Sequence, residues 1–228
     1  MSDTPKLPAL LFDLDGTLLD TAPDLHKTLN HCLKHAKRDT VSLESVQHMV
    51  GQGARVLLER GMKATGGMPD DETFENLVTL FFDFYADHLS DHSYPYPSMM
   101  EVLDKLHNSG YLMAVCTNKP YGFAKTIIED YGLAKYFPVI TGGDSFDFRK
   151  PDPRHISETI AMMSKGYEGA IMVGDTHNDI DAANAAGVGS IAVSFGYSDK
   201  PASELGAHVT IDHFDELIEA IEGLIPRL

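Results

Sequence analysis

Near the N-terminus stands the stretch Ala9-Leu10-Leu11-Phe12-Asp13-Leu14-Asp15-Gly16-Thr17, which joins a short apolar run to two acidic residues and a glycine. An apolar run of this length, bounded by a turn signal, predicts a buried strand. The Gly16-Thr17 pair predicts a tight turn directly after it. We therefore expect Asp13 and Asp15 to lie at the carboxyl end of a buried strand and to face one pocket.

Residues 21–91 show the period of helices. Thr21, with Asp24 three residues later, resembles a capping box at a helix start. A second helical segment follows Ser42, a third lies around residues 56–58, and the acidic turn 70–72 favours a fourth helix N-terminus. Apolar residues follow that turn at helical spacing: Phe74, Leu77, Phe81 and Tyr85. This block predicts a set of helices inserted after the first strand.

From residue 93 onwards the period changes. The segment 93–97, Ser-Tyr-Pro-Tyr-Pro, cannot form a helix interior and predicts a connector. Ser98 with Glu101 resembles another capping box, which would open a helix. Strands and helices then alternate, with strands expected at 112–116, 139–141, 170–173, 190–193 and 208–211.

This alternation predicts a parallel sheet with helices on both faces, because parallel strands need crossover connections. The expected fold class is α/β, with a Rossmann-like core and an inserted α-helical cap. We assign residues 1–20 and 92–228 to the core and residues 21–91 to the cap.

Composition restricts the function of the 228-residue chain. It is 43% hydrophobic, which is enough for a core, and its formal net charge is −16. So acidic a chain is a poor partner for nucleic acid, since phosphate backbones are bound by clustered Lys and Arg. No apolar run is long enough for a membrane span, and residues 1–8 lack the layout of a secretion signal. We expect a cytoplasmic protein, monomeric or homodimeric, whose two cysteines form no disulfide scaffold.

Polar residues follow four of the predicted strands. In open parallel sheets the ligand site lies at the carboxyl ends of the strands. In chain order these residues are Asp13, Asp15, Gly16 and Thr17, then Thr117, Asn118 and Lys119, then Lys150, and finally Asp175 and Asp179. Each group alone is compatible with a turn or a helix cap. Their order and their shared sheet edge predict one functional site.

The charge of these residues predicts a metal ion. Asp13, Asp15, Asp175 and Asp179 carry −4 and Lys150 carries +1, so a phosphate would meet −3. A divalent cation lowers that repulsion, and carboxylate oxygens are the ligands that Mg²⁺ prefers. We expect Mg²⁺ and Lys150 to hold the phosphoryl oxygens of a small phosphorylated metabolite while a carboxylate attacks phosphorus.

Four segments resemble the four motifs of the haloacid-dehalogenase superfamily of phosphatases. They are Phe12-Asp13-Leu14-Asp15-Gly16-Thr17, Cys116-Thr117-Asn118, Lys150-Pro151 and Gly174-Asp175-Thr176-His177-Asn178-Asp179, and they span nearly the whole chain. Residues 117–120, 50–54 and 94–97 are further similar to the bacterial phosphoglycolate phosphatase branch. The resemblance implies a phosphatase, with 2-phosphoglycolate as the first expected substrate.

The resemblance also implies residue roles. Asp13 would be the nucleophile that forms an aspartyl-phosphate, and Asp15 the general acid for the leaving alkoxide and then the base for water. Thr117 and Lys150 would bind the transferring phosphoryl group, with Asn118 beside them. The implied Mg²⁺ ligands are Asp13, the backbone carbonyl of Asp15, and Asp175, with Asp179 as a further ligand or a neighbour of the ligands.

Two further substrate contacts are expected. The small Gly16 would let backbone amides approach the ligand. The cap would supply a cation for a substrate carboxylate, because burying that charge unpaired is costly. Arg55, behind the glycines at 51 and 53, is the candidate, and Lys119 is the competing cation. The alternative is that these glycines end one cap helix and begin the next, with Arg55 solvated.

Other functions remain open from the sequence. Within enzymes these are a sugar-phosphate or nucleotide phosphatase and a phosphomutase. In another class stands a receiver-like signalling domain, which also pairs acids with a Thr and a Lys around an aspartyl-phosphate. The inserted helices and the Asp15-Gly16-Thr17 sequence argue against it. A catalytically inactive phosphate-binding domain is the last alternative, although no motif position is missing.

Overall fold

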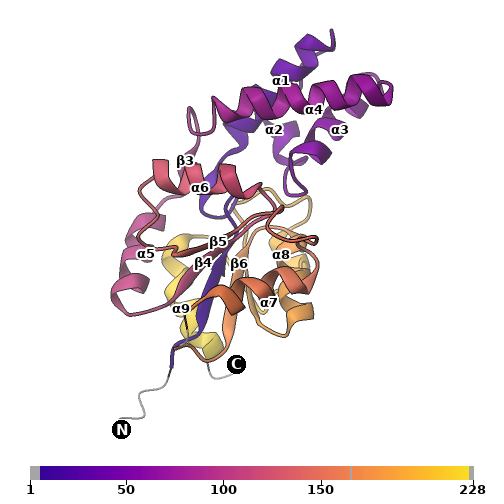
Figure 1. Ribbon diagram of the computed structural model, residues 1–228. Helices are drawn as coiled ribbons and strands as arrows, with labels where there is room; N and C mark the ends of the chain where they lie inside the picture. The colour runs from indigo at the N-terminus through magenta and orange to yellow at the C-terminus, as the bar shows by residue number, and fades with distance from the viewer. Residues whose placement is uncertain (1–5, 165, 226–228) are drawn as a thin grey trace.

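The computed structural model describes residues 6–164 and 166–225 (Figure 1). Its centre is a six-stranded sheet in the order β5-β4-β1-β6-β7-β8, and every neighbouring pair is parallel. The strands are β1 (Ala9–Phe12), β4 (Met113–Cys116), β5 (Val139–Thr141), β6 (Ala170–Gly174), β7 (Gly189–Val193) and β8 (Val209–Ile211). The predicted parallel sheet is thus confirmed, and β1 lies inside it.

Helices cover both faces of this sheet, as predicted. Leu10 and Phe12 belong to the core that also contains buried residues of α5 (Met99–Asn108), α6 (Tyr121–Asp130) and α9 (Leu217–Leu224). Ala9 and Leu11 point to the other face and pack with residues of α7 (Pro153–Met162) and α8 (His177–Ala186). All four side chains of β1 are buried, which explains why its sequence is apolar without alternation.

Four helices stand apart from the sheet, beyond the carboxyl end of β1 (Figure 1). They are α1 (Ala22–His35), α2 (Leu43–Gln47), α3 (Ala54–Ala64) and α4 (Asp71–Ala86). The predicted apolar stripe of α4 is the buried face of that helix: Phe74, Leu77, Phe81 and Tyr85. The helices therefore lie on the side of the sheet where the motif residues end their strands.

The two chain segments that join these helices to the sheet lie side by side. β2 (Leu19–Asp20) pairs antiparallel with β3 (Tyr94–Pro95), so part of the predicted connector is a short strand. The Tyr94 hydroxyl donates to Asp20 Oδ2 over 2.6 Å. Asp24 accepts hydrogen bonds from the backbone N–H groups of His92 and Ser93, at 3.0 and 2.8 Å.

Both expected capping boxes near the helix block are wrong. Thr21 makes no side-chain cap, because its hydroxyl donates to Asp15, and the Asp24 carboxylate accepts instead from residues 92 and 93. Ser98 has a left-handed backbone, with φ 62°, and also makes no side-chain cap. A capping box does occur at α8, between Thr176 and Asp179.

The remaining elements are the 3₁₀ turns η1 (Ala202–Glu204) and η2 (Phe214–Glu216), and η2 opens the helix predicted over 214–224. Among the described helices, none is long and apolar enough to cross a membrane. The predictions for residues 1–5 and 226–228 lie outside the described residues.

Candidate active site

Asp13 directly follows β1, in the middle of the sheet. Its backbone N–H donates to Val173 O over 3.0 Å, which extends the β1–β6 ladder by one residue and fixes where the side chain leaves. Its Oδ1 accepts from the N–H of Leu14 at 2.8 Å. Burial raises the pKa of Asp13 to about 6, and the Lys150 ammonium opposes that rise. The carboxylate is therefore oriented and poorly hydrated.

Lys150 is the cation at the centre of this group. Its side chain is 1% exposed, and Nζ lies 2.6 Å from Asp179 Oδ1 and 3.2 Å from Asp13 Oδ1. Nζ also donates to the carbonyl of Cys116 over 2.5 Å. Burial lowers the pKa of Lys150, but the charges of Asp13 and Asp179 outweigh it and hold the pKa above its usual value. Lys150 thus stays charged and joins two of the predicted motifs.

Asp175 and Asp179 approach from β6 and α8. Asp175 Oδ1 accepts from the Thr17 hydroxyl at 2.9 Å, and its Oδ2 accepts from the Tyr197 N–H at 2.8 Å. Burial, with the charges of Asp179 and Asp13, raises the pKa of Asp175 well above its usual range. Asp179 Oδ2 accepts from both the N–H and the hydroxyl of Thr176, so each of its oxygens already has a partner.

The carboxylates fit a divalent cation. Carboxylate oxygens of Asp13, Asp175 and Asp179 lie within 4.8 Å of one another, and all three residues are buried. Lys150 offsets only one of the three charges, and burial, followed by the charge of the neighbouring carboxylates, raises the pKa values of Asp13 and Asp175. Hard oxygen donors with excess negative charge are the donor set for Mg²⁺. The side chain of Asp15 does not belong to this group.

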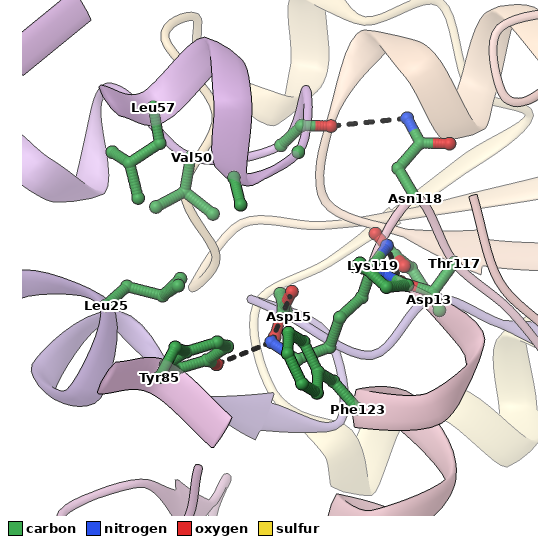
Figure 2. A pocket seen from close by; sticks show the side chains of 14 residues that line it. Asp13, Asp15, Leu25, Val50, Leu57, Tyr85, Thr117, Asn118, Lys119 and Phe123 are labelled. Atoms are coloured by element: carbon green, nitrogen blue, oxygen red, sulfur yellow. Dashed lines mark hydrogen bonds and ion pairs between the residues drawn. The ribbon is translucent and has the colours of Figure 1, made fainter. Parts of the chain in front are cut away.

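Asp15 points instead towards the helices above the sheet, as Figure 2 shows. Its Oδ1 accepts from the Thr21 hydroxyl at 2.6 Å and from Lys119 Nζ at 2.9 Å. Lys119 Nζ also donates to the Tyr85 hydroxyl over 2.6 Å. Burial lowers the pKa of Lys119, but Asp15 and Tyr85 more than offset this and raise it above its ordinary value. Lys119 therefore connects Asp15 to α4.

Thr117 and Asn118 follow β4 at the same sheet edge. Thr117 is buried, and its N–H donates to Thr141 O over 3.0 Å. Asn118 Nδ2 donates to the carbonyl of Lys150 at 2.9 Å and to that of Gly51 at 3.3 Å. Asn178 also donates to the Gly51 carbonyl, over 3.2 Å. Asn118 thus holds the Lys150 backbone and, with Asn178, fixes the loop between α2 and α3.

Gly16 lies in the loop after Asp13, and its predicted role of letting backbone amides approach a ligand stays a prediction. Its N–H donates to Leu19 O over 2.9 Å and is already used. Its φ is +79°, and an added Cβ would lie 2.3 Å from Asp175 Oδ2. The glycine is needed because the loop turns through a left-handed conformation while passing directly beside Asp175.

Arg55 is not brought to the site. Its guanidinium forms a bidentate pair with Glu75 on α4, and the two side chains are 53% and 58% exposed. It lies over the ring of Phe74 on α4 and does not line the cavity that contains Asp13. The solvated alternative is the one observed for this residue.

A cavity of about 30 Å³ lies between the sheet edge and the helices (Figure 2). Its polar lining includes Asp13, Asp15, Thr117, Asn118 and Lys119 from the sheet side, and Tyr85 from α4. Apolar side chains of Leu25, Val50, Leu57 and Phe123 complete the wall. A single water needs about 10–15 Å³ of such a cavity, so this cavity is small.

Several contributors were not singled out as site residues by the sequence analysis. Thr21, Tyr85, Asn178 and Tyr197 contact site residues through hydrogen bonds that close only in the folded chain. For Asn178 a signal existed, because it lies within the predicted fourth motif. From the sequence Tyr85 was predicted only as part of the apolar stripe of a helix. In the structure its hydroxyl also accepts a hydrogen bond from Lys119.

The sheet order and the carboxylates at its edge are those expected of a hydrolase of the haloacid-dehalogenase superfamily. A model of the haloacid dehalogenase-like hydrolase family matches residues 10–193, and the chain belongs to this family. The predicted resemblance is confirmed.

Among similar proteins, a Mesorhizobium japonicum protein named phosphoglycolate phosphatase is 43% identical over 219 residues, covering 96% of both chains. One of the same name from Agrobacterium fabrum is 43% identical over 228 residues, covering 100% of this chain and 98% of its own. The crystal structure of a predicted phosphoglycolate phosphatase from Haemophilus somnus 129PT superposes with a TM-score of 0.89 at 28% identity, covering 95% and 99% of the two chains.

Proposed function

We propose that this protein is a Mg²⁺-dependent phosphatase that hydrolyses 2-phosphoglycolate to glycolate and phosphate. The observation that carries the proposal is the buried Asp13, oriented by Leu14 and Lys150 beside two further carboxylates and open to a small cavity. The relatives named phosphoglycolate phosphatase match over nearly the full chain, which supports the substrate.

In the proposed reaction Asp13 attacks phosphorus, and the bond from phosphorus to the ester oxygen breaks. Asp15, two residues further along the same loop, donates a proton to the departing glycolate oxygen. Asp15 then removes a proton from a water, which attacks the aspartyl-phosphate and releases inorganic phosphate. Lys150 and the Thr117 hydroxyl stabilise the charge on the phosphoryl oxygens.

Mg²⁺ would be held by Asp13 and Asp175, with Asp179 beside them and the backbone carbonyl of Asp15 as a further ligand. When bound, it supplies positive charge that lets a phosphate dianion approach the carboxylates. Asp179 serves the site mainly through Lys150, since its Oδ1 is 2.6 Å from Nζ and its Oδ2 caps α8.

We also propose that residues 21–91 act as a cap over a core made of residues 1–20 and 92–228. The two connections lie paired in β2 and β3, so the helices can move as one unit against the sheet. Closure would exclude water while the aspartyl-phosphate forms.

The experiment is a panel of phosphate monoesters assayed for phosphate release with Mg²⁺. It contains 2-phosphoglycolate, a hexose phosphate, a nucleoside monophosphate and an aryl phosphate. We expect 2-phosphoglycolate to have the highest kcat/KM, by at least about 10-fold, and chelation to abolish turnover. A higher value for the sugar or nucleotide would refute the substrate, and isomerisation without phosphate release would reveal a mutase.

A further inference from the structure

The proposed substrate carries a second anionic group beyond its phosphate, and the following inference rests on that proposed function. In 2-phosphoglycolate the carboxylate carbon is two bonds from the ester oxygen. A residue that protonates this oxygen must therefore lie close to the carboxylate as well. Enclosing an unpaired carboxylate beside Asp13 and Asp15 would be costly, so a cation is needed near Asp15.

Among the described cations near the sheet edge, one is placed to bind the substrate carboxylate. Lys150 is enclosed by Asp13, Asp179 and the carbonyl of Cys116. Arg55 is paired with the exposed Glu75 and does not line the cavity that contains Asp13. Among the described residues that line the cavity containing Asp13, Lys119 is the one cation, and it is 2.9 Å from Asp15.

Tyr85 adds a neutral donor at the same point. Its hydroxyl accepts a hydrogen bond from Lys119 over 2.6 Å, which leaves its own proton to donate. Within residues 6–164 and 166–225 no acceptor for that proton is found. The ring is buried and packs edge-on against Phe123, so the hydroxyl is held in the cavity wall (Figure 2). An ammonium and a phenol hydroxyl side by side form a suitable pair for one carboxylate.

We propose that Lys119 and Tyr85 together bind the carboxylate of the substrate and determine specificity for a phosphorylated small acid. Lys119 comes from the loop after β4 and Tyr85 from α4, so the contact has one partner on each side of the cavity. A phosphate ester without the carboxylate would meet the same phosphoryl site and lose only this contact. Specificity would therefore depend on the helices being closed over the sheet.

The test compares 2-phosphoglycolate with 2-hydroxyethyl phosphate, in which a CH₂OH group replaces the carboxylate. Tyr85→Phe should lower kcat/KM for 2-phosphoglycolate about 10-fold, mainly through KM, and lower that for the neutral ester by a factor at least about 5-fold smaller. Lys119→Met should lower both, since Lys119 also contacts Asp15, but the carboxylate substrate by about 10-fold more. Lys125→Met, an exposed lysine on α6, is the matched control and should change neither.

Binding gives a readout independent of turnover. The non-hydrolysable 3-phosphonopropionate should bind wild type at least about 10-fold more tightly than propylphosphonate, and both substitutions should remove that preference. Equal losses for both ligands, or no preference in wild type, would overturn the proposal. A preference that Lys119→Met and Tyr85→Phe abolish, in a protein that does not hydrolyse 2-phosphoglycolate, would uphold the carboxylate site and refute the proposed reaction.

Discussion

Replacing Lys150 by Met should remove the only cation in contact with the buried carboxylates among the described residues, at nearly constant side-chain volume. In the native protein Nζ lies 2.6 Å from Asp179 and 3.2 Å from Asp13, and its side chain is 1% exposed. The variant leaves these two carboxylates and Asp175 enclosed without a counter-charge. In the absence of metal, nothing else described in the structure offsets them.

The size of the effect follows from the burial of the pair. Removing one partner of a buried ion pair costs about 3–5 kcal/mol, because the other charge stays desolvated. For a chain of this length about 1 kcal/mol lowers Tm by 2–4 °C. We therefore expect Tm to fall by about 6–20 °C in chelator. Because Mg²⁺ supplies charge to the same carboxylates, adding it should recover part of this loss.

The assay is thermal unfolding followed by circular dichroism, in EDTA and then in Mg²⁺. Lys125→Met controls for loss of a lysine, since its pair with Glu129 is exposed at 3.8 Å and contributes little. A fall of less than about 3 °C in EDTA would show that Lys150 does not balance the carboxylates, and the charge reasoning for the site would be refuted.

Three further changes test other parts of the site. Asp13→Asn should lower kcat by at least about 10³-fold, measured as phosphate release, because the amide cannot attack phosphorus; retained turnover would exclude Asp13 as nucleophile. Arg55→Ala should change kcat/KM by less than about 2-fold for 2-phosphoglycolate and for an aryl phosphate alike, since its partner is the exposed Glu75; a selective loss would return it to the site. Burial and the Lys150 charge lower the pKa of His155 from 6.5 to about 3. Below pH 6.5 the unfolded chain therefore binds a proton that the folded chain does not, and the free energy of unfolding decreases as the pH is lowered. Between pH 7.5 and pH 4.5 the wild type should lose about 3 kcal/mol of unfolding free energy through His155, and His155→Gln should not show this loss. Urea unfolding at both pH values measures it, and identical pH profiles for the two proteins would contradict the reasoning.

The strand ends were predictable because their signal is local. β1 is apolar without alternation and ends at Asp13, and the same pattern precedes Thr117 and Asp175, so adjacency in a parallel sheet follows from topology. Lys150 lies in the loop after β5, which β4 separates from β1, so strand adjacency alone does not predict its contacts with Asp13 and Asp179.

The contacts made by the inserted helices could not be predicted in this way. Asp24 looked like a capping residue from its spacing, yet its carboxylate binds the backbone at residues 92 and 93. Arg55 was the candidate cation for the substrate carboxylate because of its charge and its position after two glycines. In the structure Lys119 lines the cavity instead, where it donates a hydrogen bond to Tyr85 on α4. Such pairings depend on how two separately formed units meet, and no spacing within either segment encodes that.

The pairing of β2 with β3 also bears on how the chain folds. Leu10 pairs with Met113 in the central sheet, across about 100 residues of chain, most of them in α1–α4 and their loops. Helices that assemble early would bring Asp20 and Tyr94 together and shorten the remaining loop to about 30 residues. Closing a loop of that length costs about 1 kcal/mol less than closing one of about 100 residues. During folding the inserted helices would then bring β1 close to β4, its partner in the sheet. Destabilising these helices would slow formation of the sheet as well as expose the cavity.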